Sequence, residues 1–202
     1  RVYNKDMKNF SGTTFTLVGR PGCGKGTQTK FLVKYLRSRG HKKIIAFSVG
    51  ELFRRLEKKP TVLGRWTKKF LAKGQLAPEW MALALWFDEI KDKLVDKNQI
   101  VIIDGSPRRL SEAKALDFLM KDLGRKPMIP IHLDISEKEA KRRVSQRGRS
   151  DYKATSTATR MKWFKTEVVS VVKYYGRRIV KIDGEGSIEE IHQRILMALN
   201  KK

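Results

Sequence analysis

The stretch Gly19-Arg20-Pro21-Gly22-Cys23-Gly24-Lys25-Gly26-Thr27 constrains the fold more than any other part of the sequence. It follows the β-branched and aromatic run Thr13–Val18, which predicts a buried strand. It precedes residues 28–39, whose apolar positions have helical spacing. Glycines between a strand and a helix let successive backbone N–H groups point at an anion, and the helix start adds its positive dipole end. Because Lys25 supplies a mobile cation, the sequence predicts a phosphate-binding loop.

Strand-like runs alternate with helix-like segments along the rest of the chain. The five runs are residues 13–18, 44–47, 100–103, 128–135 and 179–182, the fourth of which contains Pro130. This alternation predicts a three-layer α/β fold in which a parallel five-stranded sheet has helices on both faces. Ser136-Glu137-Lys138-Glu139 and Ser187-Ile188-Glu189-Glu190 match the capping box, and Gly74 and Gly124 match helix stops.

Residues 48–97 contain no strand-like run and read as short helices broken at Pro60, Gly74 and Pro78. A helical insert of this kind usually carries specificity or closes over a ligand. We therefore expect one domain over residues 1–202, with a core of 12–47 and 98–202 and a helical lobe of 48–97.

Composition limits the cellular compartments in which the protein is expected to work. No apolar run approaches the roughly 20 residues that cross a bilayer, so no membrane partner is expected. The single cysteine, Cys23, rules out an internal disulfide. This predicts a reducing compartment, either the cytoplasm or an organelle matrix.

Asp104 directly follows the apolar run 100–103. A carboxylate at the carboxyl end of a buried strand beside a phosphate loop can hold Mg²⁺ through water, although an ordinary Asp-Gly turn is the simple alternative. Arg108, four residues on, can aim a bidentate cation into the same crevice, which favours a functional role.

Four segments in order resemble those of adenylate kinases and their nucleoside monophosphate kinase relatives. The phosphate loop is the first, and the resemblance runs from about residue 13 to 199. The other three are Phe47-Ser48-Val49-Gly50-Glu51-Leu52-Phe53-Arg54, similar to Leu-Ser-Thr-Gly-Asp-Leu-Leu-Arg; Gly74-Gln75-Leu76-Ala77-Pro78, similar to Gly-Gln-Leu-Val-Pro; and Asp104-Gly105-Ser106-Pro107-Arg108, similar to Asp-Gly-(Phe/Tyr)-Pro-Arg.

The resemblance implies transfer of the ATP γ-phosphoryl group to a nucleoside monophosphate, with Mg²⁺ held by Asp104 through water. It implies that ATP is bound by Gly22, Cys23, Gly24, Lys25, Gly26, Thr27, Arg143 and Arg147. It implies that the acceptor is bound by Ser48, Val49, Arg54, Gln75, Ala77, Gly105, Arg108 and Glu112. It implies that five cations surround the transferring phosphoryl group, where they align it and neutralise its charge: Lys25, Arg108, Arg147, Arg149 and Arg160.

The chain departs from the family at the lid and at the acceptor base. The lid, residues 147–152, is shorter than in short-lid members, Tyr152 replaces an aspartate, and one cysteine cannot form a zinc lid. Glu112 replaces a glutamine, and its carboxylate can only accept hydrogen bonds. This favours an acceptor base whose edge offers donors, such as the N1–H and amino group of guanine or the amino group of cytosine, over the adenine of AMP. The alternative is that Glu112 only stabilises the start of a helix by its charge.

The net charge of +24, from 45 Lys and Arg against 21 Asp and Glu, exceeds what the proposed site uses. A solvated basic surface explains each short cluster alone. The total raises a rival interpretation, in which a kinase-fold protein with weak or no turnover docks on RNA or a ribonucleoprotein particle. The four tryptophans, which lie among apolar helical residues, are predicted to serve packing rather than base stacking.

Overall fold

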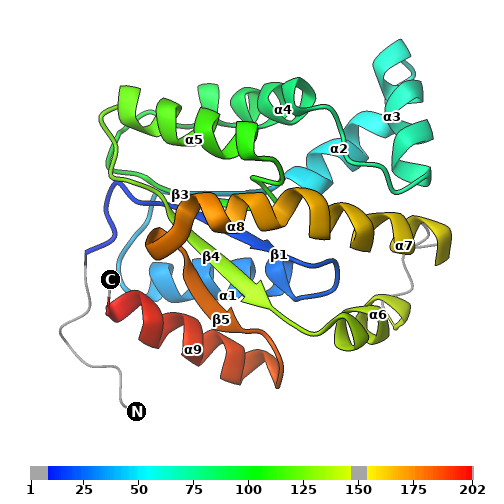
Figure 1. Cartoon of the computed structure of the whole chain (residues 1–202). Coiled ribbons are helices and arrows are strands. Elements are labelled where there is room, and N and C mark those ends of the chain that lie inside the picture. Colours follow the sequence, from blue (N-terminus) through cyan, green and yellow to red (C-terminus); the bar gives the residue numbers. More distant parts are fainter. Residues whose placement is uncertain (1–8, 147–153, 202) are drawn as a thin grey trace.

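A computed structural model describes residues 9–146 and 154–201. Its strands form one parallel sheet in the order β2-β3-β1-β4-β5 (Figure 1). The strands are β1 (Thr14–Gly19), β2 (Ile44–Ser48), β3 (Ile100–Asp104), β4 (Ile129–Asp134) and β5 (Val180–Asp183). Each lies within two residues of a predicted run, so the prediction of a parallel five-stranded sheet is confirmed.

Helices connect successive strands. The described helices are α1 (Lys25–Ser38), α2 (Val49–Glu57), α3 (Val62–Ala72), α4 (Glu79–Lys91), α5 (Leu110–Asp122), α6 (Glu137–Ser145), α7 (Ala154–Trp163), α8 (Val169–Tyr175) and α9 (Ile188–Asn200). A π-helical turn, Phe164–Val168, joins α7 to α8, and a 3₁₀ turn, Gly176–Arg178, precedes β5.

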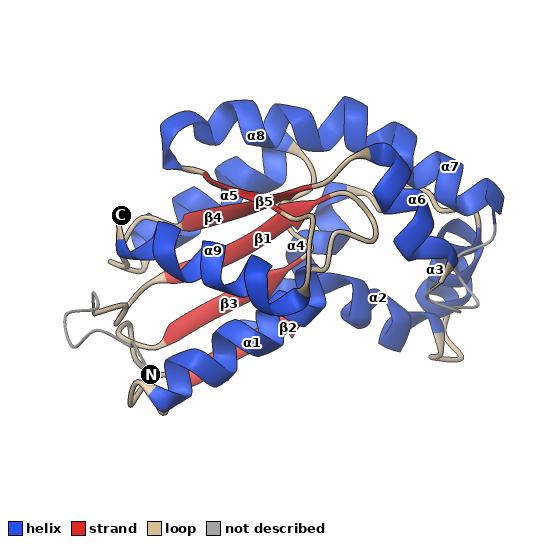
Figure 2. Ribbon diagram, turned by 90° about the horizontal axis from the view of Figure 1, so that it is seen from below, coloured by secondary structure: helices blue, strands red, loops and turns tan. Residues whose placement is uncertain are grey.

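Helices cover both faces of the sheet, which confirms the predicted three layers. Leu32 of α1 and Ile195 of α9 pack with Leu17 of β1 in a cluster on one face. A second cluster, on the other face, includes side chains of α4, α5 and α8. Figure 2 shows α1 and α9 in front of the sheet, with α5 and α8 behind it. Apolar side chains fill the space between the sheet and the helices on each face, which leaves the ends of the strands as the place for polar side chains.

Pro130 fits inside β4 because of where the neighbouring strand begins. β1 pairs with β4 from Ile129 onward, whereas pairing with β5 starts only at Ile131. Pro130 therefore lies where β4 has a strand on one side only, a position that tolerates the missing N–H.

The two predicted capping boxes have different outcomes. At Ser187 the box is complete, because its hydroxyl accepts from the Glu190 N–H while the Glu190 carboxylate accepts from the Ser187 N–H. The prediction of a full capping box at Ser136 is wrong. Its hydroxyl accepts from the Glu139 N–H, but its own N–H donates to Glu185. The Glu139 carboxylate is instead occupied by Arg142 and Arg143.

Both predicted helix stops are confirmed. Gly74 follows α3 with a φ of 66° and Gly124 follows α5 with a φ of 61°, each in the left-handed region that glycine favours. Residues 49–97 contain α2, α3 and α4 and no strand. The turn at Gly74 directs the chain from α3 toward α4 and places Gln75 beside the sheet's carboxyl edge, where the cavity described below lies.

Candidate active site

The phosphate loop connects β1 to α1 through glycines with positive φ. Gly22 and Gly24 have φ values of 83° and 95°, so the loop curls back toward the first turn of α1. A Cβ on Gly22 would lie 2.9 Å from the Ala140 carbonyl oxygen, so the loop packs closely on α6. The Lys25 ammonium donates to the carbonyl oxygens of Gly19 and Arg20, at 2.9 and 3.0 Å. It is thereby held at the loop, where a phosphate would offer it a stronger, charged acceptor.

Asp104 ends β3 directly beside the loop. A Cβ on Gly26 would lie 3.3 Å from Asp104 Oδ2, so the carboxylate occupies the space that a larger residue at position 26 would enter. The close approach follows from pairing of β1 with β3, in which Leu17 is the partner of Asp104. A carboxylate so near the start of α1 can neutralise or organise cations at bound phosphates.

Two arginines converge opposite the loop. A Cβ on Gly50, in the first turn of α2, would lie 3.4 Å from Arg54 Nη1 and 3.7 Å from Arg108 Nη2. The Arg108 Nε–H also donates to the Gly105 carbonyl at 2.6 Å, which orients its guanidinium group. Both guanidinium groups thus approach the same point in the first turn of α2, an arrangement that suits a phosphate.

The loop and the arginine pair line one cavity of about 650 Å³. This volume suits a ligand of nucleotide size. The predicted site residues that line it are Gly22, Gly24, Lys25, Gly26, Thr27, Ser48, Arg54, Gln75, Asp104, Gly105, Arg108 and Arg160.

Five predicted residues of the described chain lie outside this lining: Cys23, Val49, Ala77, Glu112 and Arg143. Cys23, Val49 and Ala77 are buried in the apolar clusters. Arg147 and Arg149, with the rest of the proposed lid at 147–152, lie outside the described residues.

Glu112 is buried in the first turn of α5, and one of its oxygens has two donors. Oε2 accepts from the Ser106 hydroxyl and from the Arg108 N–H, both at 2.9 Å. Burial raises the pKa of the Glu112 carboxyl, with both hydrogen bonds acting in the opposite direction. The Glu112 carboxylate thus holds the segment that carries Arg108 in place through two hydrogen bonds.

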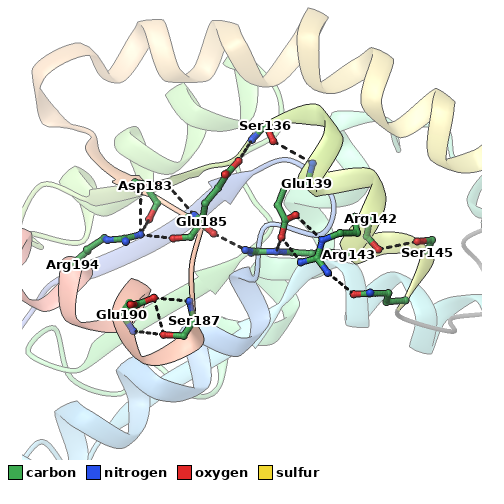
Figure 3. Close-up of polar contacts among 12 residues, drawn as sticks. Ser136, Glu139, Arg142, Arg143, Ser145, Asp183, Glu185, Ser187, Glu190 and Arg194 are labelled. Atoms are coloured by element: carbon green, nitrogen blue, oxygen red, sulfur yellow. Dashed lines mark hydrogen bonds and ion pairs between the residues drawn. The ribbon is translucent and has the colours of Figure 1, made fainter.

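Arg143 belongs to a polar network between α6 and the segment after β5 (Figure 3). Its Nε donates to Glu139 at 2.6 Å and its Nη1 to the Gly184 carbonyl at 3.0 Å. Hydrogen bonds from Arg142 and Arg143 lower the pKa of Glu139 to about 2. Because a Cβ on Gly22 would be 3.5 Å from Arg143 Cβ, the network lies beside the phosphate loop.

Sequence reasoning missed several cavity residues. Trp163 of α7 lines the cavity and contacts Arg108. Three cations of α1, four and three residues apart, also line it: Lys30, Lys34 and Arg37. Their spacing on one helix face was a readable signal, whereas nothing local marks Trp163.

The described residues contain neither a cluster of metal ligands nor a helix that could span a membrane. In residues 9–146 and 154–201, no three His, Cys, Asp or Glu side chains cluster as a metal site. Over the same ranges, no helix has the length and apolar character to span a membrane.

Comparison with known proteins agrees with this geometry. Residues 17–180 match the sequence model of the family described as Adenylate kinase. An adenylate kinase of Azobacteroides pseudotrichonymphae is 34% identical over 187 residues, covering 89% of this chain and 93% of the relative. One of Mycobacterium leprae is 34% identical, covering 92% and 98%, and one of Thermobifida fusca is 32% identical, covering 92% and 97%. The resemblance read from the sequence is confirmed, and the chain belongs to the adenylate kinase family of phosphotransferases.

Proposed function

We propose that this protein transfers the γ-phosphoryl group of ATP to a nucleoside monophosphate, and that AMP is the acceptor to test first. One observation carries the proposal: the phosphate loop and the converging guanidinium groups of Arg54 and Arg108 line a single cavity. Two anion sites facing each other are what a transfer between two phosphorylated nucleotides requires.

On the donor side, Lys25 and the loop N–H groups would bind the ATP phosphates. Lys25 would exchange its two carbonyl acceptors for charged phosphate oxygens without moving far. Arg143, held by Glu139 and the Gly184 carbonyl, would border the donor nucleotide together with Arg147.

On the acceptor side, Arg54 and Arg108 would bind the monophosphate, with Ser48, Gln75 and Gly105 close by. The base is the open part of this assignment. Because the Glu112 Oε2 is engaged by Ser106 and Arg108, it is not offered to a base edge, which weakens the case against AMP. Val49 and Ala77, also expected at the acceptor, would act by packing behind the cavity wall.

Mg²⁺ fits the residues present. Asp104 offers a carboxylate beside the loop, and Mg²⁺ is typically held by one or two carboxylates, waters and substrate phosphates rather than by a protein cage. Asp104 would hold the ion through water, and the ion would neutralise charge on the ATP phosphates. The protein's own contribution is then alignment: Lys25, Arg108 and Arg160, with Arg147 and Arg149, would surround the transferring group with positive charge and exclude water.

The rival interpretation of an RNA-docked protein without turnover gains no support from the family match or the relatives. We propose a reducing compartment, the cytoplasm or an organelle matrix. The support is that Cys23, the one cysteine of the sequence, is buried as a free thiol beside Lys25.

The test is a coupled assay of nucleoside diphosphate formation from ATP, Mg²⁺ and each of AMP, GMP, CMP and UMP. We expect turnover with at least one acceptor, and loss of at least about 100-fold in Lys25→Met and Arg108→Ala, since each removes a charge at the transferring group. Lys114→Met, on the exposed face of α5, is the matched control. Absence of turnover with all four acceptors in a folded, ATP-binding protein would refute the proposal.

A further inference from the structure

Trp163 lies where three parts of the cavity meet. It is the last residue of α7, directly before the π-helical turn Phe164–Val168. Its half-buried ring lines the cavity on one side and packs against an apolar cluster on the other. A π-helical turn inside a long helix is often found at a functional site, because it re-aims the side chains around it.

The Trp163 ring faces Arg108. The guanidinium carbon of Arg108 lies 5.4 Å from the ring centroid, within the range of a cation–π interaction. The same guanidinium group donates from Nε to the Gly105 carbonyl and directs Nη2 toward the first turn of α2, near Arg54. The ring therefore contacts a group that is already oriented toward the proposed acceptor phosphate.

The indole N–H fixes the ring to the turn after α3. Trp163 Nε1 donates to the Gly74 carbonyl oxygen at 3.0 Å, which joins two positions 89 residues apart. Gly74 precedes Gln75, a cavity residue that we expect at the acceptor. One side chain thus links that turn to Arg108.

Helix α7 meets this turn at other points as well, so the contact is not isolated. A Cβ on Gly74 would lie 2.3 Å from the Ser156 carbonyl oxygen, which shows how closely the backbones approach. Arg160 Nη2 lies 3.5 Å from the Leu71 carbonyl oxygen. Figure 1 draws α7 beside the segment that follows α3.

We propose that Trp163 is a positioning residue for the acceptor phosphate: its ring holds the Arg108 guanidinium group, and its N–H ties that group to the turn at Gly74. The inference rests on the proposed function and assigns a role to a residue outside the phosphate loop and the arginine set. An ordered guanidinium group loses less conformational freedom when a phosphate binds than a mobile one would. Removing the ring should weaken the acceptor more than the donor.

The test compares Trp163→Phe, which keeps a ring but removes the N–H, with Trp163→Leu, which removes both. Calorimetric binding of ATP and of AMP, GMP, CMP and UMP is measured for each, and KM and kcat where turnover exists. From the range of cation–π energies we expect AMP affinity to fall about 10-fold in Trp163→Leu and about 3-fold in Trp163→Phe, with ATP affinity within about 2-fold of the parent. Trp80→Leu, on an exposed side chain of α4, is the matched control and should change neither.

A double-mutant cycle separates positioning from general packing. In the Arg108→Lys background the ring no longer holds a planar guanidinium group, so Trp163→Leu should weaken AMP by less than about 2-fold. Trp163→Phe and the cycle keep the test decisive if Trp163→Leu folds poorly.

The outcomes are distinct. If the parent binds ATP but no monophosphate, the proposed function fails. If the parent binds AMP and Trp163→Leu binds it equally well, or weakens ATP as much as AMP, the inference about Trp163 fails alone. An altered ranking of the four monophosphates without a common loss of affinity also overturns it, because the ring would then contact the base.

Discussion

Replacing Glu112 separates its charge from its hydrogen bonds. A single oxygen, Oε2, accepts from both the Ser106 hydroxyl and the Arg108 N–H. In Glu112→Gln the amide oxygen can accept both, while the buried charge is gone. In Glu112→Leu both donors lose their acceptor inside the protein.

The magnitude follows from this difference. An unsatisfied buried donor costs about 1–3 kcal/mol. Of the two donors only the Ser106 hydroxyl is fully buried, so the leucine variant should be less stable than the glutamine variant by at least about 1–3 kcal/mol. Relative to the parent, the glutamine variant should be more stable at pH 7, since burial raises the pKa of the Glu112 carboxyl and the folded state therefore disfavours its charge.

The pH dependence has a defined sign. Below the pKa of an unfolded glutamate, about 4.3, the carboxyl is neutral in both states and the parent bears no penalty. As pH rises through the raised folded pKa, the parent loses stability and Glu112→Gln does not. The gap between the two should therefore open from about pH 4 upward and then become constant.

The assay is urea unfolding of the parent and both variants from pH 4 to pH 8. Glu189→Gln, an exposed acid in the first turn of α9, is the matched control and removes only a helix-dipole contribution of about 0.3–1 kcal/mol. A glutamine variant less stable than the parent at pH 7 would refute the reasoning. The same variant tests base selection, because a shift toward AMP in the acceptor panel would show that the Glu112 carboxylate contacts the base.

Two further predictions concern the approach of α7 and the cations of α1. Gly74→Ala should lower the free energy of unfolding by about 1–2 kcal/mol because of the left-handed φ at this position, and by about 1–3 kcal/mol more because the new Cβ clashes with Ser156. Gly124→Ala is the control, because Gly124 has a similar φ but open space around it, so only the first loss is expected. Equal losses for the two variants in urea titrations would contradict this. Neutralising the three α1 cations should lower kcat/KM several-fold at low salt and little at 0.5 M salt, with kcat unaffected by the mutation at either. The set is Lys30→Gln, Lys34→Gln and Arg37→Gln, with Lys42→Gln and Lys43→Gln as control.

The parts of the fold that could be predicted are those fixed by short stretches of chain. The phosphate loop needs only its glycines, Lys25 and the flanking strand and helix, which are contiguous in sequence. Ser187 and Glu190 complete their box from groups that lie only three residues apart. Ser136 does not complete its box, because Glu185, 49 residues away, accepts from its N–H.

The parts that could not be predicted depend on where a side chain points once distant segments meet. For Glu112 the sequence offered two roles, contact with the acceptor base or stabilisation of the helix start, and it could not show that Oε2 accepts from Ser106 and Arg108. Trp163 packs against an apolar cluster, as predicted, but its second set of contacts, with the Gly74 carbonyl and the Arg108 guanidinium group beside the cavity, has no signal in the sequence. A residue's neighbours in sequence define its element, but the fold defines its contacts.

Two parts of the excess positive charge can be placed once the sheet is known. Lys30, Lys34 and Arg37 line the cavity and can attract nucleotides that carry several negative charges. The clusters Lys42-Lys43 and Arg177-Arg178 instead precede β2 and β5, at the amino edge of a parallel sheet whose carboxyl edge forms the site. A strand of four or five residues is about 13–16 Å long, which exceeds the Debye length of about 8 Å at physiological ionic strength. None of these four side chains lines the cavity, so we expect the charge dependence of the reaction to arise mainly from the cations that do, namely those of α1 together with Lys25, Arg54, Arg108 and Arg160.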